Sequence, residues 1–302
     1  MGTYYTIKVV VDAGEHFAMA DSVDRLLDDF NRLMSNYIED SEISRLNNAP
    51  AQQWIPISDD MLIVLEAALE TSRKSDGAFD ITVAPLVNLW GFGPEGRPQR
   101  IPAEEEIRAG RTLVGFQHLQ LRRRPPAVKK GIENLTCDLA AIAKGYGVDV
   151  MAGLFERQGF SRYMVEIGGE IRTRGLNQKN QPWRIGISTP DDSRFGIQKV
   201  ISLRDISVAT SGDYRNYFEQ NGVRFSHTID PRSGRPISHK LVSVTVIHPS
   251  CMMADAWATT ISVLGPDDGF ELAQELELPV FMIVKETNGF AEKMTSQFKP
   301  FI

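Results

Sequence analysis

The segment SCMMADAWATTISVLG, residues 250–265, restricts the possible folds most, because its pattern predicts a helix that is buried on all faces. Ser250 is a good helix N-cap and Gly265 a good stop signal, and nearly every residue between them is apolar. Asp255 is the only charged residue in this segment. Because an isolated buried carboxylate is costly unless it is paired or bound to a cation, the fold has to supply Asp255 with a partner.

Thr259 follows Asp255 by four residues, so the two side-chain oxygens share one face of the helix, with about 5–6 Å between the Cβ atoms. A carboxylate and a hydroxyl are hard oxygen ligands, suited to a Mg²⁺ ion that stays partly hydrated and also takes phosphate oxygens. The alternative is that Asp255 pairs with an arginine or lysine and Thr259 only packs. The helix alone leaves both interpretations open.

A second stretch, CDLAAIAKGYGVD at residues 137–149, places a carboxylate, an amine and two glycines at the opening of a predicted helix. Helix N-termini present unpaired N–H groups, glycines let a ligand come close, and Lys144 adds a full charge, which together suit a phosphate. Asp138 either caps the helix through the N–H of Ala140 or Ala141, or binds another part of the ligand. The stretch is equally compatible with a capped helix whose small residues pack on a sheet.

His227 is the third candidate, near the end of a predicted strand that leads into the turn of SHTIDPRSG. A lone histidine is usually structural, but His227 has Ser226 and Asp230 beside it, and the other four histidines have no comparable polar context. The ordinary pKa of histidine, near 6.5, suits a general base that removes a proton from an alcohol.

Hydrophobic periodicity predicts strands and helices that alternate without a repeat. The predicted helices cover about residues 17–34, 59–75 and 250–265, besides the one that opens near residue 144. Residues 39–48 are expected to be irregular and turn-rich, and residues 121–130 to be the solvated tip of a hairpin. The predicted strands cover about residues 3–11, 183–188, 199–209, 224–229, 241–248 and 280–285, together with a hairpin at 163–175.

The later strands are joined mainly by turns, such as DPRSGRP at residues 230–236, which favours antiparallel pairing. The predicted class is therefore α+β, with a large, mostly antiparallel sheet flanked by helices. The length of 302 residues fits one large domain or two interlocked ones.

Gly91, Gly93 and Gly96 satisfy the GxGxxG pattern of dinucleotide-binding domains. That fingerprint requires a helix that starts within it, and Pro94 and Pro98 forbid one. We interpret the stretch as a loop and reject a nicotinamide-type Rossmann domain. Asp80, which follows Phe79 in an otherwise apolar run, is of more interest, because a carboxylate there needs a hydrogen-bonding partner.

Composition excludes several classes of partner. The formal charge of -6 and the pI near 5.5 offer no general attraction to nucleic acid or to anionic lipid. No apolar run approaches the ~20 residues that span a bilayer. Cys137 and Cys251 are too few for a disulfide framework, and inert buried thiols are the expected state of both.

Taken together, these motifs resemble those of the ApbE family of Mg²⁺-dependent FAD:protein FMN transferases, along nearly the whole chain. Several short motifs in the right order are more specific than any single one. The matching motifs are MGT (1–3), MSNYIEDSEISRLN (34–47), GAFDITVAPLVNLWGFGP (77–94), DLAAIAKGYGVD (138–149), IGGEIRTRG (167–175), ATSGDYRNYF (209–218), SHTIDPRSGRP (226–236) and ADAWATTISVLG (254–265). The resemblance implies a single T-fold-like α+β domain over residues 1–302.

The resemblance also implies roles for individual residues. His227 resembles the catalytic histidine of the family. Lys144 and Asp255 correspond to positions that also take part in catalysis. The metal site corresponds to the backbone carbonyl of Ala141 with the side chains of Asp255 and Thr259. The positions that correspond to FAD contacts are Met1, Tyr37, Ala78, Phe79, Asp80, Asp138, Lys144 and Ile229. Some relatives carry an acid where this chain has Ala258, so the resemblance does not support a further metal contact there.

The implied reaction uses Mg²⁺ to move FMN from FAD to a threonine of a partner protein, with release of AMP. A hydrolase, in which water takes the place of threonine and gives FMN and AMP, would have an identical site. A non-enzymatic periplasmic FAD carrier is the other alternative.

The family also suggests where the protein works and on what. Its expected targets are subunits of sodium-pumping quinone reductase or RNF-type complexes. Family members usually begin with a secretory signal and a lipid-attachment cysteine, so we expect a periplasmic lipoprotein on the inner membrane. This chain begins almost at the MGT motif, and we expect that it is trimmed to the mature domain, with membrane contact only through the absent lipid anchor.

Overall fold

The computed structural model describes residues 2–11, 19–94, 100–189, 196–212, 217–220, 222–287 and 289–302. The chain forms two compact units, each assembled from separate stretches of sequence. The first unit contains residues 1–28, 142–214 and 240–302, and the second contains residues 29–141 and 215–239. Helix α1 (Ala20–Met34) begins in the first unit and ends in the second.

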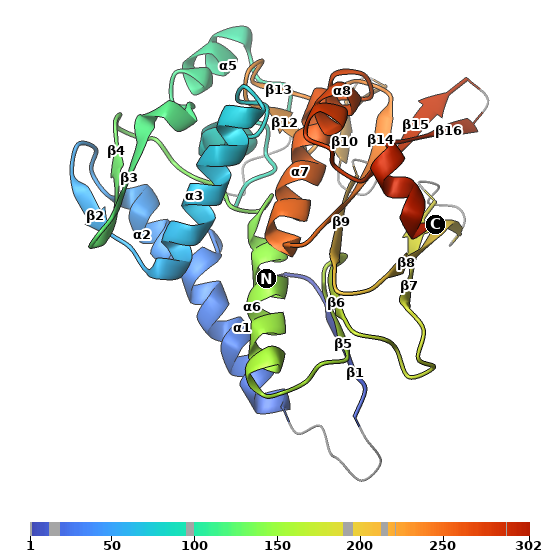
Figure 1. Ribbon diagram of the computed structural model, residues 1–302. Coiled ribbons are helices and arrows are strands. Elements are labelled where there is room, and N and C mark those ends of the chain that lie inside the picture. Colours follow the sequence, from blue (N-terminus) through green and yellow to red (C-terminus); the bar gives the residue numbers. More distant parts are fainter. Residues whose placement is uncertain are drawn as a thin grey trace. The chain divides into compact units, whose positions relative to one another are not determined.

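The first unit is built on a seven-stranded sheet in the order β1-β5-β6-β9-β14-β15-β16, in which every neighbouring pair is antiparallel (Figure 1). The strands are β1 (Tyr5–Val9), β5 (Tyr163–Ile167), β6 (Glu170–Arg174), β9 (Ser207–Gly212), β14 (Leu241–His248), β15 (Val280–Glu286) and β16 (Gly289–Met294). A separate ribbon pairs β7 (Trp183–Ser188) with β8 (Ile197–Leu203). The helices are α6 (Ala143–Arg157), α7 (Cys251–Leu264), α8 (Asp268–Glu275) and the 3₁₀ segment η3 (Ser296–Phe301).

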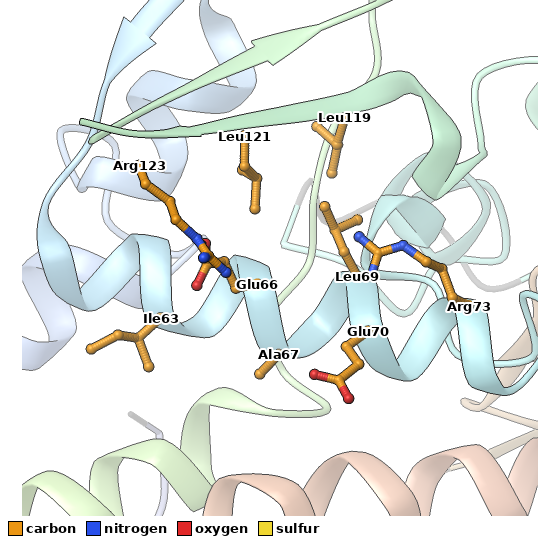
Figure 2. A pocket seen from close by; sticks show the side chains of 9 residues that line it. All are labelled: Ile63, Glu66, Ala67, Leu69, Glu70, Arg73, Leu119, Leu121 and Arg123. Carbon is orange, nitrogen blue, oxygen red and sulfur yellow. The ribbon is translucent and has the colours of Figure 1, made fainter. Parts of the chain in front are cut away.

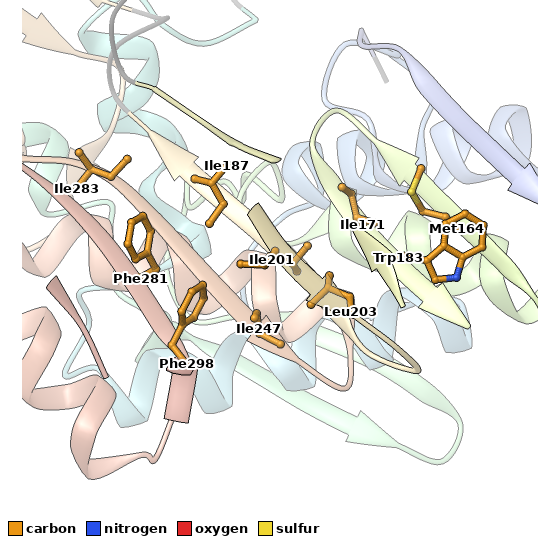
Figure 3. Close-up of a cluster of buried hydrophobic side chains, with 11 residues drawn as sticks. Met164, Ile171, Trp183, Ile187, Ile201, Leu203, Ile247, Phe281, Ile283 and Phe298 are labelled. Atoms are coloured by element: carbon orange, nitrogen blue, oxygen red, sulfur yellow. The ribbon is translucent and has the colours of Figure 1, made fainter. Parts of the chain in front are cut away.

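Apolar side chains cover both faces of this sheet, because successive strand residues point to opposite sides. On β15, Val280 and Met282 pack with α7 and α8, whereas Phe281 and Ile283 pack with β7, β8 and η3. Figure 3 shows the second of these clusters, in which Phe281 stacks on Phe298 with 5.5 Å between the ring centroids. Burial of each such side chain stabilises the fold by roughly 1.5–3 kcal/mol relative to exposure.

The second unit combines short helices with three small sheets. Its helices are α2 (Glu42–Asn48), α3 (Asp59–Lys74), α4 (Ala84–Leu89), α5 (Glu104–Arg111) and the 3₁₀ turns η1 (Ile81–Val83) and η2 (Phe116–His118). A three-stranded sheet has the order β2 (Trp54–Pro56), β4 (Pro126–Lys130), β3 (Leu119–Arg123). Two ribbons pair β10 (Tyr217–Gln220) with β11 (Val223–Ser226) and β12 (Ile229–Asp230) with β13 (Arg235–Pro236). Leu86, Trp90 and Ile107 form its core with Phe218 and Ile229.

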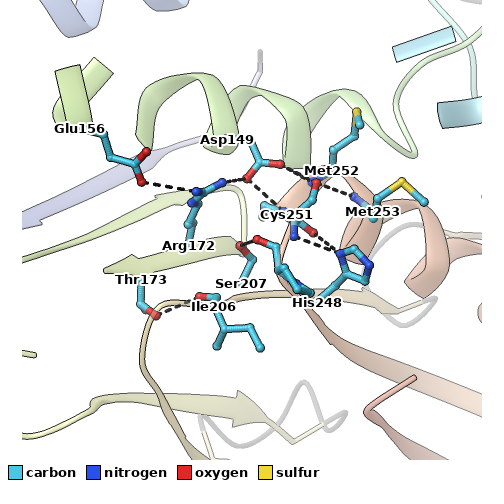
Figure 4. A network of polar contacts seen from close by, with 12 residues as sticks. Asp149, Glu156, Arg172, Thr173, Ile206, Ser207, His248, Cys251, Met252 and Met253 are labelled. Carbon is cyan, nitrogen blue, oxygen red and sulfur yellow. Dashed lines mark hydrogen bonds and ion pairs between the residues drawn. The ribbon is translucent and has the colours of Figure 1, made fainter. Parts of the chain in front are cut away.

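A carboxylate on α6 holds the start of α7 in the first unit (Figure 4). The Oδ2 atom of Asp149 accepts hydrogen bonds from the Ser250 hydroxyl at 2.8 Å and the Met252 N–H at 3.0 Å. Its Oδ1 atom accepts from the Cys251 N–H at 3.1 Å and from the Arg172 guanidinium at 2.7 Å. The first N–H groups of a helix have no partner within the helix, and an anion there also suits the helix dipole. Asp149 therefore fixes α7 against α6.

The structure confirms the predicted antiparallel α+β class and most of the predicted elements. The hairpin at residues 163–175, the strand at 241–248 and the helix between Ser250 and Gly265 lie where the pattern placed them. The basic stretch at 121–130 is a hairpin of β3 and β4. The helix predicted near residue 59 ends at Lys74, as expected from Asp76 and Gly77, which both have positive φ.

Several predictions were wrong in detail. Residues 42–48 form helix α2 and not an irregular segment, because Ser41 caps it by accepting from the Ser44 N–H at 3.1 Å. The predicted strand 199–209 is divided by a turn at Asp205, where φ is positive. The predicted strand 224–229 is also two strands, β11 and β12. Phe17, at the start of the first predicted helix, and Gly96 of the rejected glycine pattern lie outside the described residues.

Figure 2 shows a pocket on the second unit, between α3 and β3. Its lining mixes apolar side chains with charged ones, and the Arg123 guanidinium donates to the Glu66 carboxylate at 2.6 Å. None of the residues that the sequence analysis assigned to a site lines this pocket. Within the part of the chain that the structure describes, no helix is both long and apolar enough to cross a membrane.

Candidate functional site

Asp255 lies where α7 packs against α6, and it is only 4% exposed. Its Oδ2 atom accepts a hydrogen bond from the Gly145 N–H at 3.0 Å, and its Oδ1 atom accepts one from the Lys144 ammonium at 3.3 Å. The two stretches that the sequence analysis singled out therefore meet at this carboxylate. The partner that buried Asp255 requires is the lysine of the other motif.

This meeting depends on the absence of a side chain at Gly145. A Cβ atom there would lie 2.3 Å from the carbonyl oxygen of Cys251 and 2.8 Å from the Cβ atom of Asp255. Both distances are far below van der Waals contact, so only glycine lets the two helices approach closely enough for the Gly145 N–H to reach Asp255.

Glu170 is a second buried acid in the same cluster, and the sequence analysis did not assign it to the site. It is 3% exposed, and its Oε1 atom lies 3.3 Å from the Lys144 ammonium. Its Oε2 atom is buried without a hydrogen-bond partner. The only sign of Glu170 in the sequence is that an acid directly follows the glycine pair of IGGE. The sequence analysis interprets that glycine pair only as a hairpin turn.

The shared ammonium governs the electrostatics of this cluster. Burial raises the pKa of Glu170 to about 8; Lys144 counteracts the shift, and Asp255 adds to it. Burial disfavours the charged form of Lys144, but the two carboxylates outweigh burial and raise the pKa of the ammonium above its usual value. Lys144 therefore stays charged between two acids, and 32% of its side chain is exposed.

The start of α6 differs from the expectation. Helix α6 begins at Ala143, and its N-cap residue, Ile142, provides no side-chain cap. Asp138 does accept from the Ala140 N–H, at 2.8 Å, but this bond holds a turn that precedes the helix. In the first turn of the helix, the Gly145 N–H is used by Asp255. Of the two alternatives for Asp138, the bond to the Ala140 N–H is therefore present, but it caps the turn before α6 and not α6 itself.

Asp80, in the second unit, has found the partners that its burial requires. Its Oδ1 atom accepts from the N–H and the hydroxyl of Thr82, at 2.8 and 2.7 Å, and its Oδ2 atom accepts from the Phe116 N–H at 2.8 Å. Burial raises the pKa of Asp80, and these hydrogen bonds counteract the rise. Ala78 and Phe79, just before it, are 1% and 2% exposed. The N–H groups of these two residues are also bonded, to the carbonyl and the hydroxyl of Ser75 at 3.0 and 3.1 Å.

Tyr37 and His227 are placed differently within the second unit. Tyr37 is 78% exposed, so its ring is available to a ligand. His227 follows β11 and meets the ring of Phe92 edge to face, with 6.4 Å between the ring centroids. The nearby carboxylate of Asp230 accepts from the N–H and the guanidinium of Arg232, at 2.9 and 3.0 Å.

The predicted site residues are divided between the two units. Lys144, Asp255 and the half-buried Thr259 belong to the first unit. Met1 lies outside the described residues. The second unit holds Tyr37, Ala78, Phe79, Asp80, Asp138, Ala141, His227 and Ile229.

The donor set on α7 fits a hard divalent cation. Asp255 and Thr259 provide a carboxylate and a hydroxyl four residues apart on one helix. Among the described residues, no group of three or more His, Cys, Asp or Glu side chains is arranged to hold a metal ion. A site with only the carboxylate and the hydroxyl of α7 suits Mg²⁺, because this ion usually keeps several waters and binds phosphate oxygens of the substrate.

The cysteines take no part in this chemistry. Both Cys137 and Cys251 are buried, free thiols. Burial raises the pKa of Cys137 to about 12 and also raises that of Cys251. Both are therefore protonated and unreactive at neutral pH, as expected from the sequence.

Comparison with known proteins identifies the class of protein to which this fold and this site belong. The model of the ApbE family matches residues 1–282. The chain belongs to this family, and it is a flavin transferase.

Relatives support the assignment over the full length. The FAD:protein FMN transferase of Vibrio cholerae is 47% identical over 304 residues, which cover 100% of this chain and 90% of that protein. The FAD:protein FMN transferase of Escherichia coli K12 is 41% identical, over 100% of this chain and 87% of that protein.

Solved structures of flavin transferases support the same family assignment. The flavin transferase ApbE of Vibrio cholerae superposes with a TM-score of 0.92 at 46% identity, over 100% of this chain and 96% of that one. The apo form of the Pseudomonas stutzeri flavinyl transferase ApbE gives a TM-score of 0.91 at 40% identity, over 100% of this chain and 94% of that one. The flavin substrate and the fold predicted from the sequence are thereby confirmed.

We predict that Gly145→Ala destabilises the protein by about 1–3 kcal/mol, because the added methyl group forces α6 away from α7. Gly153→Ala is the matched control on the same helix, since a Cβ atom there meets only the mobile end of the Arg157 side chain, at 3.2 Å. This control should leave stability unchanged or raise it by up to ~1 kcal/mol. Urea denaturation measures both variants, and equal stability of the two would contradict the packing argument.

Proposed function

We propose that this protein uses Mg²⁺ to transfer FMN from FAD to a threonine hydroxyl of a target protein, with release of AMP. The observation that carries the proposal is the buried Asp255 carboxylate with the Lys144 ammonium beside it and the Thr259 hydroxyl one turn further along α7. This cluster combines oxygen ligands for a hard cation with a positive charge for a phosphate.

Each residue has a role in this reaction. Asp255, Thr259 and the backbone carbonyl of Ala141 would hold the Mg²⁺ ion, which when bound offsets the negative charge of the FAD pyrophosphate. Lys144 would place its ammonium against a phosphoryl oxygen. His227 would take the proton of the threonine hydroxyl.

The bonds made and broken follow from these roles. The threonine oxygen attacks the FMN-side phosphorus, and the bond between that phosphorus and the bridging oxygen breaks. The bridging oxygen leaves with AMP. The product carries FMN on threonine through a phosphoester, and no oxidant or reductant is required.

Most of the residues that we propose as FAD contacts belong to the second unit. The exposed ring of Tyr37 can stack on an aromatic part of the ligand. Ala78 and Phe79 are also proposed contacts, although both residues are buried. The further proposed contacts are Met1, Asp80, Asp138, Lys144 and Ile229.

The acceptor and the location belong to the same proposal. The acceptor threonine would lie in a short Ser/Thr-Gly-Ala-Ser/Thr-like motif, in subunits of sodium-pumping quinone reductase or of RNF-type complexes. We further propose that the enzyme works in the periplasm, as a lipoprotein of the inner membrane. Both points rest on the family resemblance and not on a feature of the fold.

The transfer reaction can be tested with FAD, Mg²⁺ and a peptide that carries the acceptor motif. We expect a fluorescent covalent adduct whose mass exceeds that of the peptide by one FMN group, together with an equal amount of AMP. Asp255→Asn should reduce adduct formation to the level seen with a chelator. Release of FMN and AMP without adduct would identify a hydrolase, and tight FAD binding without any AMP would identify a carrier.

A second prediction concerns His227. Replacement of a general base typically slows a reaction by ~10²–10⁴-fold. His227→Ala should therefore lose transfer to this extent and keep its affinity for FAD, measured by quenching of flavin fluorescence. His239→Ala, a half-buried histidine of the same unit, is the control and should retain both. If His227→Ala transfers FMN at the full rate, the residue is not the base.

A further inference from the structure

The buried cluster on α6, α7 and β6 contains two acids and a single amine. Asp255 and Glu170 are 4% and 3% exposed, and the ammonium of Lys144 lies 3.3 Å from one oxygen of each. One ammonium therefore serves two carboxylates. Such an arrangement is costly in a core unless the second acid has a purpose or acquires a cation.

The proposed metal site creates a conflict at Asp255. The Oδ2 atom of Asp255 is occupied by the Gly145 N–H, so Oδ1 is the oxygen best placed to bind a cation. Lys144 donates to this same oxygen. Because an ammonium and a divalent cation repel each other, Lys144 has to leave Oδ1 when the ion binds.

Glu170 offers a place for the displaced ammonium. Its Oε1 atom already contacts Lys144, and its Oε2 atom is buried without a hydrogen-bond partner, so the carboxylate has unused capacity to accept. It is also held firmly, because β6 begins at Glu170 and pairs it with Ile167. The turn between them consists of Gly168 and Gly169, whose φ values of 63° and 107° favour glycine.

We propose that Glu170 is a positioning residue that holds the Lys144 ammonium when a divalent cation takes its place on Asp255. The inference rests on the proposed metal-dependent function and adds a specific role for a residue outside the predicted site. Lys144 thereby keeps its charge near the bound phosphate, and Asp255 becomes available to the ion. Without Glu170, Lys144 would have Asp255 as its remaining acid in this cluster and would compete with the ion.

The test is a double-mutant cycle that measures Mn²⁺ affinity by electron paramagnetic resonance, without FAD and without turnover. The four proteins are the wild type, Glu170→Gln, Lys144→Met and the double variant. We expect Glu170→Gln to weaken Mn²⁺ binding at least ~10-fold when Lys144 is present and less than ~2-fold when it is replaced, because the two residues are coupled. Glu166→Gln is the control, since Glu166 lies on the neighbouring strand β5 and accepts from the Tyr4 hydroxyl at 3.2 Å. It should leave Mn²⁺ affinity unchanged.

Two results would overturn the inference. An equal loss with and without Lys144 would mean that Glu170 acts directly on the ion, as a ligand or through its charge. No loss in either background would mean that it has no part in cation binding. In both cases the metal-dependent function would stand, whereas a wild-type protein that binds no Mn²⁺, either alone or with FAD present, would refute that function and this inference together.

A further variant distinguishes the effect of side-chain length at Glu170 from the effect of its charge. It can also replace Glu170→Gln if that variant does not fold. Glu170→Asp keeps the carboxylate but is shorter by one methylene group, which is enough to break the contact with Lys144. We expect Mn²⁺ affinity to fall for this variant while circular dichroism shows an intact fold. Unchanged affinity in a folded Glu170→Asp protein would contradict a role that depends on contact with Lys144.

Discussion

The close contact between α6 and α7 is the constraint on which the functional part of the first unit depends. Gly145 permits the approach, and its N–H binds the Asp255 carboxylate that the approach buries. About one turn away from this contact, Asp149 accepts hydrogen bonds from three donors at the start of α7 and from the guanidinium of Arg172. The two helices are thus fastened at two points by carboxylates that each bridge from one helix to the other. This explains how a helix with a single charged residue can carry that acid into a core.

Charge balance connects this packing to chemistry. A core that needed only stability would have matched one acid with one ammonium or replaced both with apolar residues. Here Lys144 stands between Asp255 and Glu170, so two buried acids share one amine. A hard cation would favour the ionised form of both acids, and a phosphate would then offset the charge of the cation. The cluster therefore has the groups that suit a metal ion bound together with a pyrophosphate, as we propose.

The sequence predicted the fold where one local pattern dominated. The helix from Ser250 to Gly265 was clear because a cap, an apolar run and a glycine agreed, and the antiparallel class followed from short turns between strands. Helix α2 was missed because it is short and polar and depends on a single cap at Ser41. Asp255 and Lys144 were found because each was unusual in its own segment. Glu170 was missed because its significance arises only from tertiary contacts, since nothing in a hairpin pattern reveals that the acid after two glycines faces a lysine from another helix.

We propose above all that Asp255 exchanges the Lys144 ammonium for a divalent cation when the ion binds. The most direct test is a crystal of the protein soaked with FAD and Mn²⁺, with the ion located by its anomalous diffraction. We expect an anomalous peak about 2.0–2.3 Å from an oxygen of Asp255 and from the Thr259 hydroxyl, with Lys144 turned to Glu170. A peak elsewhere, or an Asp255 carboxylate that still binds Lys144 while FAD and the ion are present, would contradict the claim.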